Sequence, residues 1–185
     1  FVSWHPPHDW GVDRDTLIYK YDTIPELMSM HDRDNIRLRP NVEDTPEVRR
    51  AYHGYYGMCS GVDIAFGRLM DKLKQRGFDD NTLVIFASDH GDNLNSYNYR
   101  IPKDHPEDTA ARIPFLMCWP GHLPQAQTRD LLVGPMDMMP TILGLMDLPV
   151  PDCVQGKDLS QAVLKGQDDV VESLLACSPR SFGQV

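Results

Sequence analysis

The sequence lacks a hydrophobic run long enough to cross a membrane. A spanning helix needs about 20 mostly apolar residues, whereas the longest candidate, residues 131–146, is interrupted by Gly134, Pro135, Asp137 and Pro140. A signal peptide is also missing, and the chain opens at Phe1 in a segment that reads as a strand already under way, Phe1–Trp4. We therefore expect a truncated or processed chain that does not contact a membrane.

Positive charge is scarce as well. The chain has 18 Lys and Arg against 27 Asp and Glu, giving a net charge of −9 and a pI near 5.1. Nucleic acid is not expected as a partner, because its phosphate backbone selects basic surfaces. The same acidic field would repel a small-molecule sulfate or phosphate ester, so such a substrate requires a local cluster of cations.

The four cysteines show no CxxC pair and no regular spacing; they are Cys59, Cys118, Cys153 and Cys177. This pattern does not predict a disulfide framework, and it favours a reducing compartment. We expect a soluble protein of the cytoplasm or the periplasm.

The length of 185 residues and a hydrophobic content of 41% predict one domain, residues 1–185, with a sizeable core. A capping side chain followed by Pro46 begins a long amphipathic helix that ends at Arg76-Gly77. The glycines within this helix, Gly54, Gly57 and Gly61, suggest that another backbone approaches it closely. The apolar run Thr82–Ala87 predicts a strand buried on both faces, as in a parallel sheet. Further strands are predicted at 113–119 and 174–177, and short helices at 137–145 and 159–164. Alternating strands and helices indicate a layered α/β domain.

The predicted strand at 82–87 runs directly into Ser88-Asp89-His90-Gly91-Asp92. Ligands of open α/β sheets bind at the carboxyl ends of strands, and a carboxylate beside an imidazole suits a divalent ion such as Mn or Zn and tolerates Mg or Ca. The alternative interpretation is a polar turn with a capping Asp. Asp92 is a candidate third ligand, although its spacing after Gly91 favours a side chain turned towards solvent or Lys103.

The segment Phe86–Asp92 resembles the metal-binding segment of sulfatases and phosphonate monoester hydrolases, which belong to the alkaline phosphatase superfamily. Other landmarks of that family follow in family order along nearly the whole chain; they are Trp4–Asp9, Tyr55–Met58, Val62–Asp63, Arg112–Phe115, Trp119–Gly121, Met136–Leu143 and Gln155–Leu159. The resemblance implies an alkaline phosphatase-like layered α/β sheet with helices on both faces, here truncated to the central and C-terminal part.

The resemblance also implies a role for four residues. Asp89 and His90 would be metal ligands. His8 would donate a hydrogen bond to the ester or its leaving group, and Lys103 would hold a sulfate oxygen. These two would be the catalytic and substrate-binding residues of a metal-dependent sulfuric ester hydrolase. The expected cofactors are a divalent ion (Ca, Mn or Zn), bound weakly because two ligands do not fill a coordination sphere, and a formylglycine in an upstream segment.

Several departures from the family pattern leave alternatives open. The family forms its nucleophile within C/S-x-P-x-R, which this sequence does not contain; Cys177-Ser178-Pro179-Arg180-Ser181 has its Arg one residue too early. We therefore expect the chain alone to be inactive. Between Asp92 and Lys103 the expected glycines are absent, and Tyr97 stands where the family has His. A phosphodiesterase or phosphonate monoester hydrolase on the same scaffold, and a non-catalytic anion-binding fragment, remain alternative functions.

Overall fold

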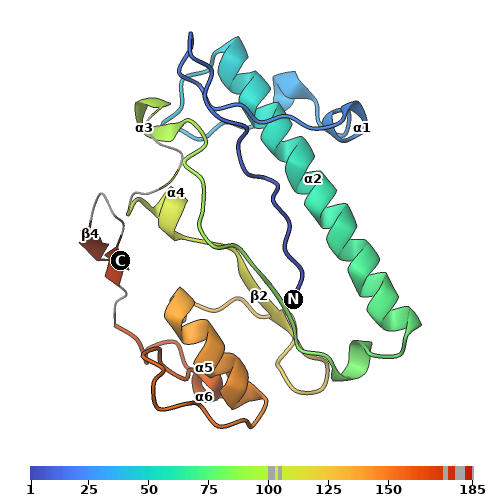
Figure 1. Cartoon of the computed structure of the whole chain (residues 1–185), viewed down its shortest axis with the longest axis vertical. Helices are drawn as coiled ribbons and strands as arrows, with labels where there is room; N and C mark the ends of the chain where they lie inside the picture. Colours follow the sequence, from blue (N-terminus) through green and yellow to red (C-terminus); the bar gives the residue numbers. More distant parts are fainter. Residues whose placement is uncertain (100–102, 104–105, 173–174, 178–181, 185) are drawn as a thin grey trace. The chain divides into compact units, whose positions relative to one another are not determined.

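The computed structural model describes residues 1–99, 103, 106–172, 175–177 and 182–184 (Figure 1). The chain divides into two compact units. The first comprises Phe1–Asp79 and Asp92–Lys103, and the second comprises Asp80–Gly91 and Asp104–Val185. Each unit has its own set of buried hydrophobic side chains.

The first unit is built around one long helix, α2 (Pro46–Gln75) (Figure 1). Two short elements pack against it, α1 (Pro25–Met28) and a 3-10 helix at Arg33–Asn35. The helical turn α3 (Ser96–Tyr99) also belongs to this unit. Much of the remaining chain before residue 46 follows irregular loops, so long-range contacts rather than regular structure must hold it in place.

Local signals explain where α2 begins and ends. The Thr45 hydroxyl accepts a hydrogen bond from the Val48 N–H at 3.2 Å, which satisfies one of the unpaired donors of the first turn. Pro46 occupies the first turn, where its missing N–H costs nothing. After Arg76, Gly77 adopts a left-handed backbone with φ of 67°. The helix predicted from the sequence is confirmed.

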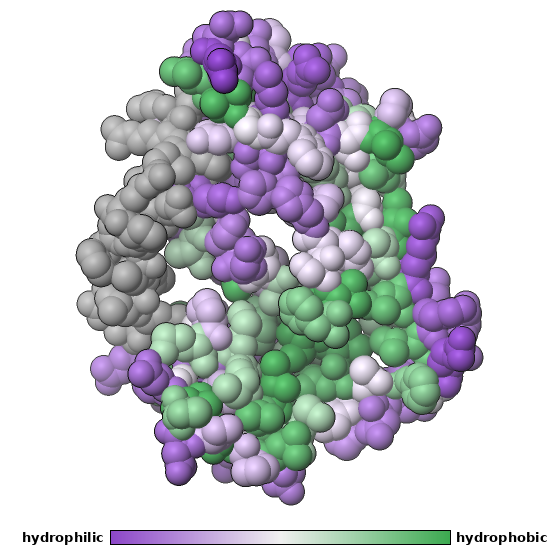
Figure 2. Space-filling view, in the orientation of Figure 1, coloured by the Kyte–Doolittle hydropathy of each residue, from purple (hydrophilic) through white to green (hydrophobic). Residues whose placement is uncertain are grey.

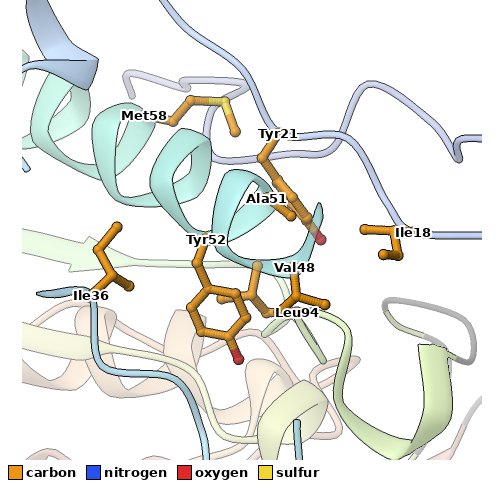
Figure 3. Close-up of a cluster of buried hydrophobic side chains, with 8 residues drawn as sticks. All are labelled: Ile18, Tyr21, Ile36, Val48, Ala51, Tyr52, Met58 and Leu94. Carbon is orange, nitrogen blue, oxygen red and sulfur yellow. The ribbon is translucent and has the colours of Figure 1, made fainter. Parts of the chain in front are cut away.

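The buried face of α2 carries the hydrophobic core of the first unit (Figure 3). Its members come from the helix and from segments on both sides of it in the sequence; they are Ile18, Tyr21, Ile36, Val48, Ala51, Tyr52, Met58 and Leu94. Gly54 lies on this face, and a Cβ there would be 1.9 Å from the Tyr21 carbonyl oxygen. The close backbone approach that the glycines suggested therefore occurs at Gly54.

The second unit contains short strands and helices. They are β1 (Val84–Ala87), α4 (Asp108–Ala111), β2 (Phe115–Cys118), α5 (Pro135–Leu145), α6 (Ser160–Lys165), β3 (Leu175–Cys177) and β4 (Phe182–Gln184). A 3-10 helix at Asp79–Asn81 precedes β1. The buried hydrophobic residues of this unit include Leu123, Leu145 and Leu159. Predicted strands and helices are thus found close to their expected positions.

The prediction for β1 was wrong in one respect. β1 pairs with β2 in an antiparallel register, Val84 opposite Cys118 and Ala87 opposite Phe115, and its side chains are only partly buried or exposed. A short apolar run reports hydrophobicity but not the direction of the neighbouring strand, so it could not separate the two arrangements. Phe1–Trp4, also predicted as a strand, has an irregular backbone.

Asp137 ties α5 to the loop that precedes α6. The helix begins at Pro135, so Asp137 lies in its first turn, where its carboxylate accepts the Gly134 N–H at 2.9 Å. The other carboxylate oxygen accepts the Lys157 N–H at 2.8 Å. The Thr141 hydroxyl adds a third tie by accepting the Leu159 N–H at 3.0 Å. Asp137 and Thr141 therefore link α5 to the segment that leads into α6.

Surface hydrophobic residues gather over β2 and α5 (Figure 2). Leu116 of β2 and Met136 and Met139 of α5 have exposed side chains. No helix in the described part of the chain combines the length and the hydropathy needed to cross a bilayer.

Candidate active site

His8 and Lys103 meet in the first unit although 95 residues separate them in the sequence. The Lys103 ammonium donates a hydrogen bond to Nε2 of His8. On the other side of the ring, Nδ1 donates to the Asp9 carbonyl oxygen at 2.8 Å. Because a carbonyl oxygen can only accept, the imidazole carries its proton on Nδ1 and offers a lone pair at Nε2. Each residue thus fixes the orientation of the other.

This arrangement holds the Lys103 ammonium beside a neutral imidazole, and the Asp9 carboxylate lies 3.6 Å from Nδ1 of the same ring. The ammonium of Lys103 has three donors, of which His8 uses one. The remaining N–H groups can be donated to an anion, and the His8 side chain is 36% exposed, so the site is open to solvent. In this tautomer the donor towards an anion is Lys103, whereas His8 donates only when it is protonated. The pair supplies the local cation that an anionic ester requires.

A second contact network holds the loop that leads from Asp92 towards Lys103. The Tyr21 hydroxyl lies 2.9 Å from both carboxylate oxygens of Asp92, and one of these oxygens also accepts the Leu94 N–H at 2.7 Å. The guanidinium of Arg39 donates to the carbonyl oxygens of Asp92 and Asn93 at 2.8 and 2.7 Å. Asp92 therefore points into this network, and the expectation that it turns towards solvent or Lys103 was wrong.

The surroundings shift the pKa values of two members of this network, Asp92 and Tyr21. Burial raises the pKa of Asp92, and the hydrogen bonds from Leu94 and Tyr21 oppose that shift only in part. Burial, followed by the negative charge of Asp92, raises the pKa of Tyr21 far above its usual value. The phenol therefore stays protonated and remains a donor to Asp92 across the physiological pH range.

Asp89 and His90 lie in the second unit, directly after β1. The imidazole Nε2 is 3.6 Å from a carboxylate oxygen of Asp89, and the other carboxylate oxygen accepts the His90 N–H at 3.0 Å. Nδ1 lies 2.7 Å from the Gly91 carbonyl oxygen, which leaves Nε2 as the lone-pair nitrogen. Burial would raise the pKa of Asp89, but the nearby imidazole and the hydrogen bonds outweigh it and lower the pKa.

This donor set fits part of a metal site. A carboxylate that is 85% exposed and an imidazole lone pair face the same space. Both are ligands for divalent ions such as Mn or Zn. In the described part of the chain no group of three or more His, Cys, Asp or Glu side chains is arranged to hold a metal. Asp89 and His90 could thus contribute two ligands.

The structure therefore brings the four predicted site residues together as two pairs, one in each unit. Residues 104 and 105, next to Lys103, and residues 178–181 of the Cys177–Ser181 segment lie outside the described residues. Tyr21 and Arg39 were missed from the sequence, because they lie in an irregular segment whose pattern carries no sign of their distant partners.

Comparison with known proteins supplies the context for these pairs. The sequence pattern of the sulfatase family matches residues 10–148. An endo-4-O-sulfatase of Bacteroides thetaiotaomicron is 39% identical over 178 residues, covering 92% of this chain and 33% of that protein. The chain thus spans about a third of that relative's length.

Solved structures with a similar fold include a sulfatase and a phosphonate monoester hydrolase. A Bacteroides thetaiotaomicron structure from work on the metabolism of multiple glycosaminoglycans superposes with a TM-score of 0.77 at 33% identity, over 94% of this chain and 36% of that one. A phosphonate monoester hydrolase from Silicibacter pomeroyi superposes with a TM-score of 0.64 at 26% identity, over 81% of this chain and 30% of that one. The fold is therefore a partial alkaline phosphatase-like α/β fold, as the sequence predicted.

Proposed function

Because this chain belongs to the sulfatase family, we propose that it forms part of a sulfuric ester hydrolase in which Lys103, oriented by His8, binds the sulfate group of the ester. The observation that carries the proposal is the contact between these two side chains across 95 residues of sequence. An ammonium held by a neutral imidazole presents fixed donors to a sulfate oxygen. Such preorganised donors stabilise the charge that develops in group transfer.

The Asp89–His90 pair would contribute two ligands to a divalent ion. A bound ion would polarise the sulfuryl oxygens as a Lewis acid. In this proposal the protein's own residues have separate tasks: Lys103 binds an oxygen of the anion, His8 orients Lys103 through Nε2, and the Asp9 carbonyl fixes the tautomer of His8. The formylglycine typical of sulfatases would serve as nucleophile in the complete enzyme.

Hydrolysis of phosphonate monoesters is the second candidate. The likeness to the Silicibacter pomeroyi hydrolase favours it, although the identity of 26% is lower than the 39% shared with the endo-4-O-sulfatase. Both candidates need the same cationic pair, since both substrates carry a tetrahedral anionic group. A sulfatase should bind the sulfate ester more tightly, and a phosphonate monoester hydrolase should bind the phosphonate more tightly.

Calorimetric titration of the 185-residue chain with 4-nitrophenyl sulfate tests the proposal. Lys103→Ala removes a hydrogen bond to a charged group, so we expect its Kd to rise at least about tenfold. Lys72→Ala is the matched control, because Lys72 is an exposed lysine on α2. Equal affinities of the two variants would refute the sulfate site. A clear preference of the wild-type chain for 4-nitrophenyl phenylphosphonate would favour the second candidate.

A further inference from the structure

Residues 10–20 form a hairpin within the irregular N-terminal part of the first unit. The backbone N–H of Trp10 donates to the Lys20 carbonyl oxygen, and that of Lys20 donates to the Gly11 carbonyl oxygen, both at 2.8 Å. The Trp10 indole N–H closes the open end of the hairpin by donating to the Asp22 carbonyl oxygen at 2.9 Å. Since backbone and side chain both tie the two limbs together, one limb has little freedom to move against the other.

Each limb of the hairpin leads to a residue with a distant partner. The first limb begins two residues after His8, and the second limb runs directly into Tyr21. The short connection after His8 is itself fixed, because the Asp9 carboxylate accepts the Gly11 N–H at 2.8 Å. The hairpin therefore couples the position of Tyr21 to that of His8.

The second limb also holds the loop that follows Asp92. The Tyr21 hydroxyl lies 2.9 Å from both oxygens of the Asp92 carboxylate. Tyr19, which forms a bridge to Val12 of the first limb, donates its N–H to the side chain of Asn95 at 3.2 Å. Asn95 is buried, with 2% exposure, so water competes little for this contact. The loop thus starts from two fixed points on the hairpin.

We propose that Tyr21 and Asn95 are positioning residues of the sulfate site, which act through the hairpin on the contact between Lys103 and His8. This inference rests on the proposed function and adds residues that set the geometry of that site. Lys103 follows Asn95 by eight residues and donates a hydrogen bond to Nε2 of His8. A loop with fewer free residues between fixed points loses less entropy when its ends meet. The two anchors therefore favour the contact between the ammonium and the imidazole.

This coupling distinguishes a positioning role from a purely structural one. Sulfate binds the arrangement in which His8 orients Lys103, so the affinity falls with the fraction of molecules in that arrangement. Linkage makes the effect reciprocal, and bound sulfate should strengthen the contact between Tyr21 and Asp92 by the same factor. A network that only stabilises the fold would change the free energy of unfolding but not the affinity of the folded chain.

The test observes the His8 ring in the 185-residue chain by 15N NMR at about pH 8.5, where imidazoles are neutral. The Nε2 signal reports the hydrogen bond that its lone pair accepts. In Tyr21→Phe we expect this signal to shift towards its position in Lys103→Ala, which lacks the donor. Tyr55→Phe is the matched control, because Tyr55 meets the Tyr21 ring edge-on at 5.4 Å and its hydroxyl contacts Cys59. It should leave the Nε2 signal in place.

Calorimetry with inorganic sulfate adds a binding readout. Tyr21→Phe should raise the Kd by about threefold, less than Lys103→Ala does, because the ammonium remains. Asn95→Gly provides a second variant: it allows the φ of 60° and removes the acceptor for Tyr19, so it should shift both readouts in the same direction.

An unchanged Nε2 signal together with an unchanged sulfate Kd in the folded variants would overturn the positioning role, even if both variants are less stable. The proposed function fails separately, when Lys103→Ala leaves the sulfate Kd unchanged. In that case the Nε2 signal of His8 still decides whether Tyr21 and Asn95 position the pair, because it is recorded without sulfate.

Discussion

Replacing Tyr21 with phenylalanine removes one hydroxyl from the network that holds the loop after Asp92. The Tyr21 side chain is buried, with 3% exposure, so the phenylalanine ring fills the same space and creates no cavity. What is lost is the single O–H donor that lies 2.9 Å from both oxygens of the Asp92 carboxylate. The change therefore isolates one hydrogen bond to a partly buried charge.

The cost of this substitution depends on whether Asp92 is ionised. Hydrogen bonds to charged groups contribute about 1.5–3 kcal/mol, and bonds between neutral groups about 0.5–1.5 kcal/mol. We expect Tyr21→Phe to lower the free energy of unfolding by about 2 kcal/mol when Asp92 is charged and by about 1 kcal/mol when it is protonated. The cost should thus increase with pH.

The direction follows from the pKa of Asp92. Burial raises this pKa above the unfolded value of about 3.9. Between the two values the folded state binds more protons than the unfolded state, so the stability contributed by protonated Asp92 is fully present below about pH 3.9 and is lost as the pH rises through the folded pKa. The Tyr21 hydrogen bond lowers that pKa, so its removal raises the pKa further and extends this loss to higher pH.

Urea unfolding of both proteins at acidic and at neutral pH measures the difference. The same substitution in an Asp92→Asn background is the control, because a residue without a charge should make the cost of Tyr21→Phe independent of pH. A cost that is the same at both pH values in the wild-type background would refute the assigned role of the hydroxyl. Carboxyl chemical shifts that give the same pKa of Asp92 in the wild-type chain and in Tyr21→Phe would also refute it.

Three further outcomes are expected. Gly54→Ala should destabilise the chain by about 1–3 kcal/mol, because its Cβ would lie 1.9 Å from a backbone oxygen. Gly67→Ala on the same helix should stabilise it by about 0.5–1 kcal/mol, because nothing lies within 4 Å of the new Cβ. Thermal unfolding that gives both changes the same sign would contradict this. Asp137→Asn keeps one carbonyl acceptor and loses one of two hydrogen bonds from backbone N–H groups. Urea unfolding should therefore show a free energy of unfolding that is lower by about 1–3 kcal/mol. An unchanged midpoint would show that the link between α5 and the loop before α6 is dispensable. Calorimetric titration with Mn, Zn and Ca should reveal only weak binding, because two ligands are fewer than the four or more of stable sites; submicromolar binding that Asp89→Asn abolishes would mean that further side chains complete the site.

The sequence predicted the helices better than the strands, because the signals of helices are local. The Thr45 cap, the proline of the first turn and the glycine after Arg76 lie within a few residues of the ends that they define. A strand is paired with a distant segment, and β1 meets β2 through a connection of 27 residues, Ser88–Pro114. The apolar run located β1, whereas its antiparallel direction depends on the path of that connection.

The site residues divide in a similar way. Asp89 and His90 are adjacent, and their position after an apolar run was visible in the sequence. The partnership of His8 and Lys103 came from the family resemblance, since no spacing links residues so far apart. Tyr21 and Arg39 had neither a local pattern nor a place in the quoted family motifs. Their role depends on side-chain contacts with residues more than 50 positions away.

The loop between Asp92 and Lys103 shows how a departure from a sequence pattern can be compensated. Its expected glycines are absent, yet Leu94, Asn95 and Tyr97 have positive φ values of 43°, 60° and 60°. Asparagine tolerates this region, but leucine and tyrosine are strained there.

Contacts in the first unit offset that strain. The Asn95 side chain accepts the Tyr19 N–H at 3.2 Å, and Arg39 and Asp92 hold the preceding residues. Glycine would make this backbone conformation easier to adopt but would lose the tie to Tyr19, because it has no side chain. In this chain, side-chain hydrogen bonds take over the task that backbone freedom performs elsewhere. The backbone of residues 92–95 is therefore held by Tyr21, Arg39 and Asp92.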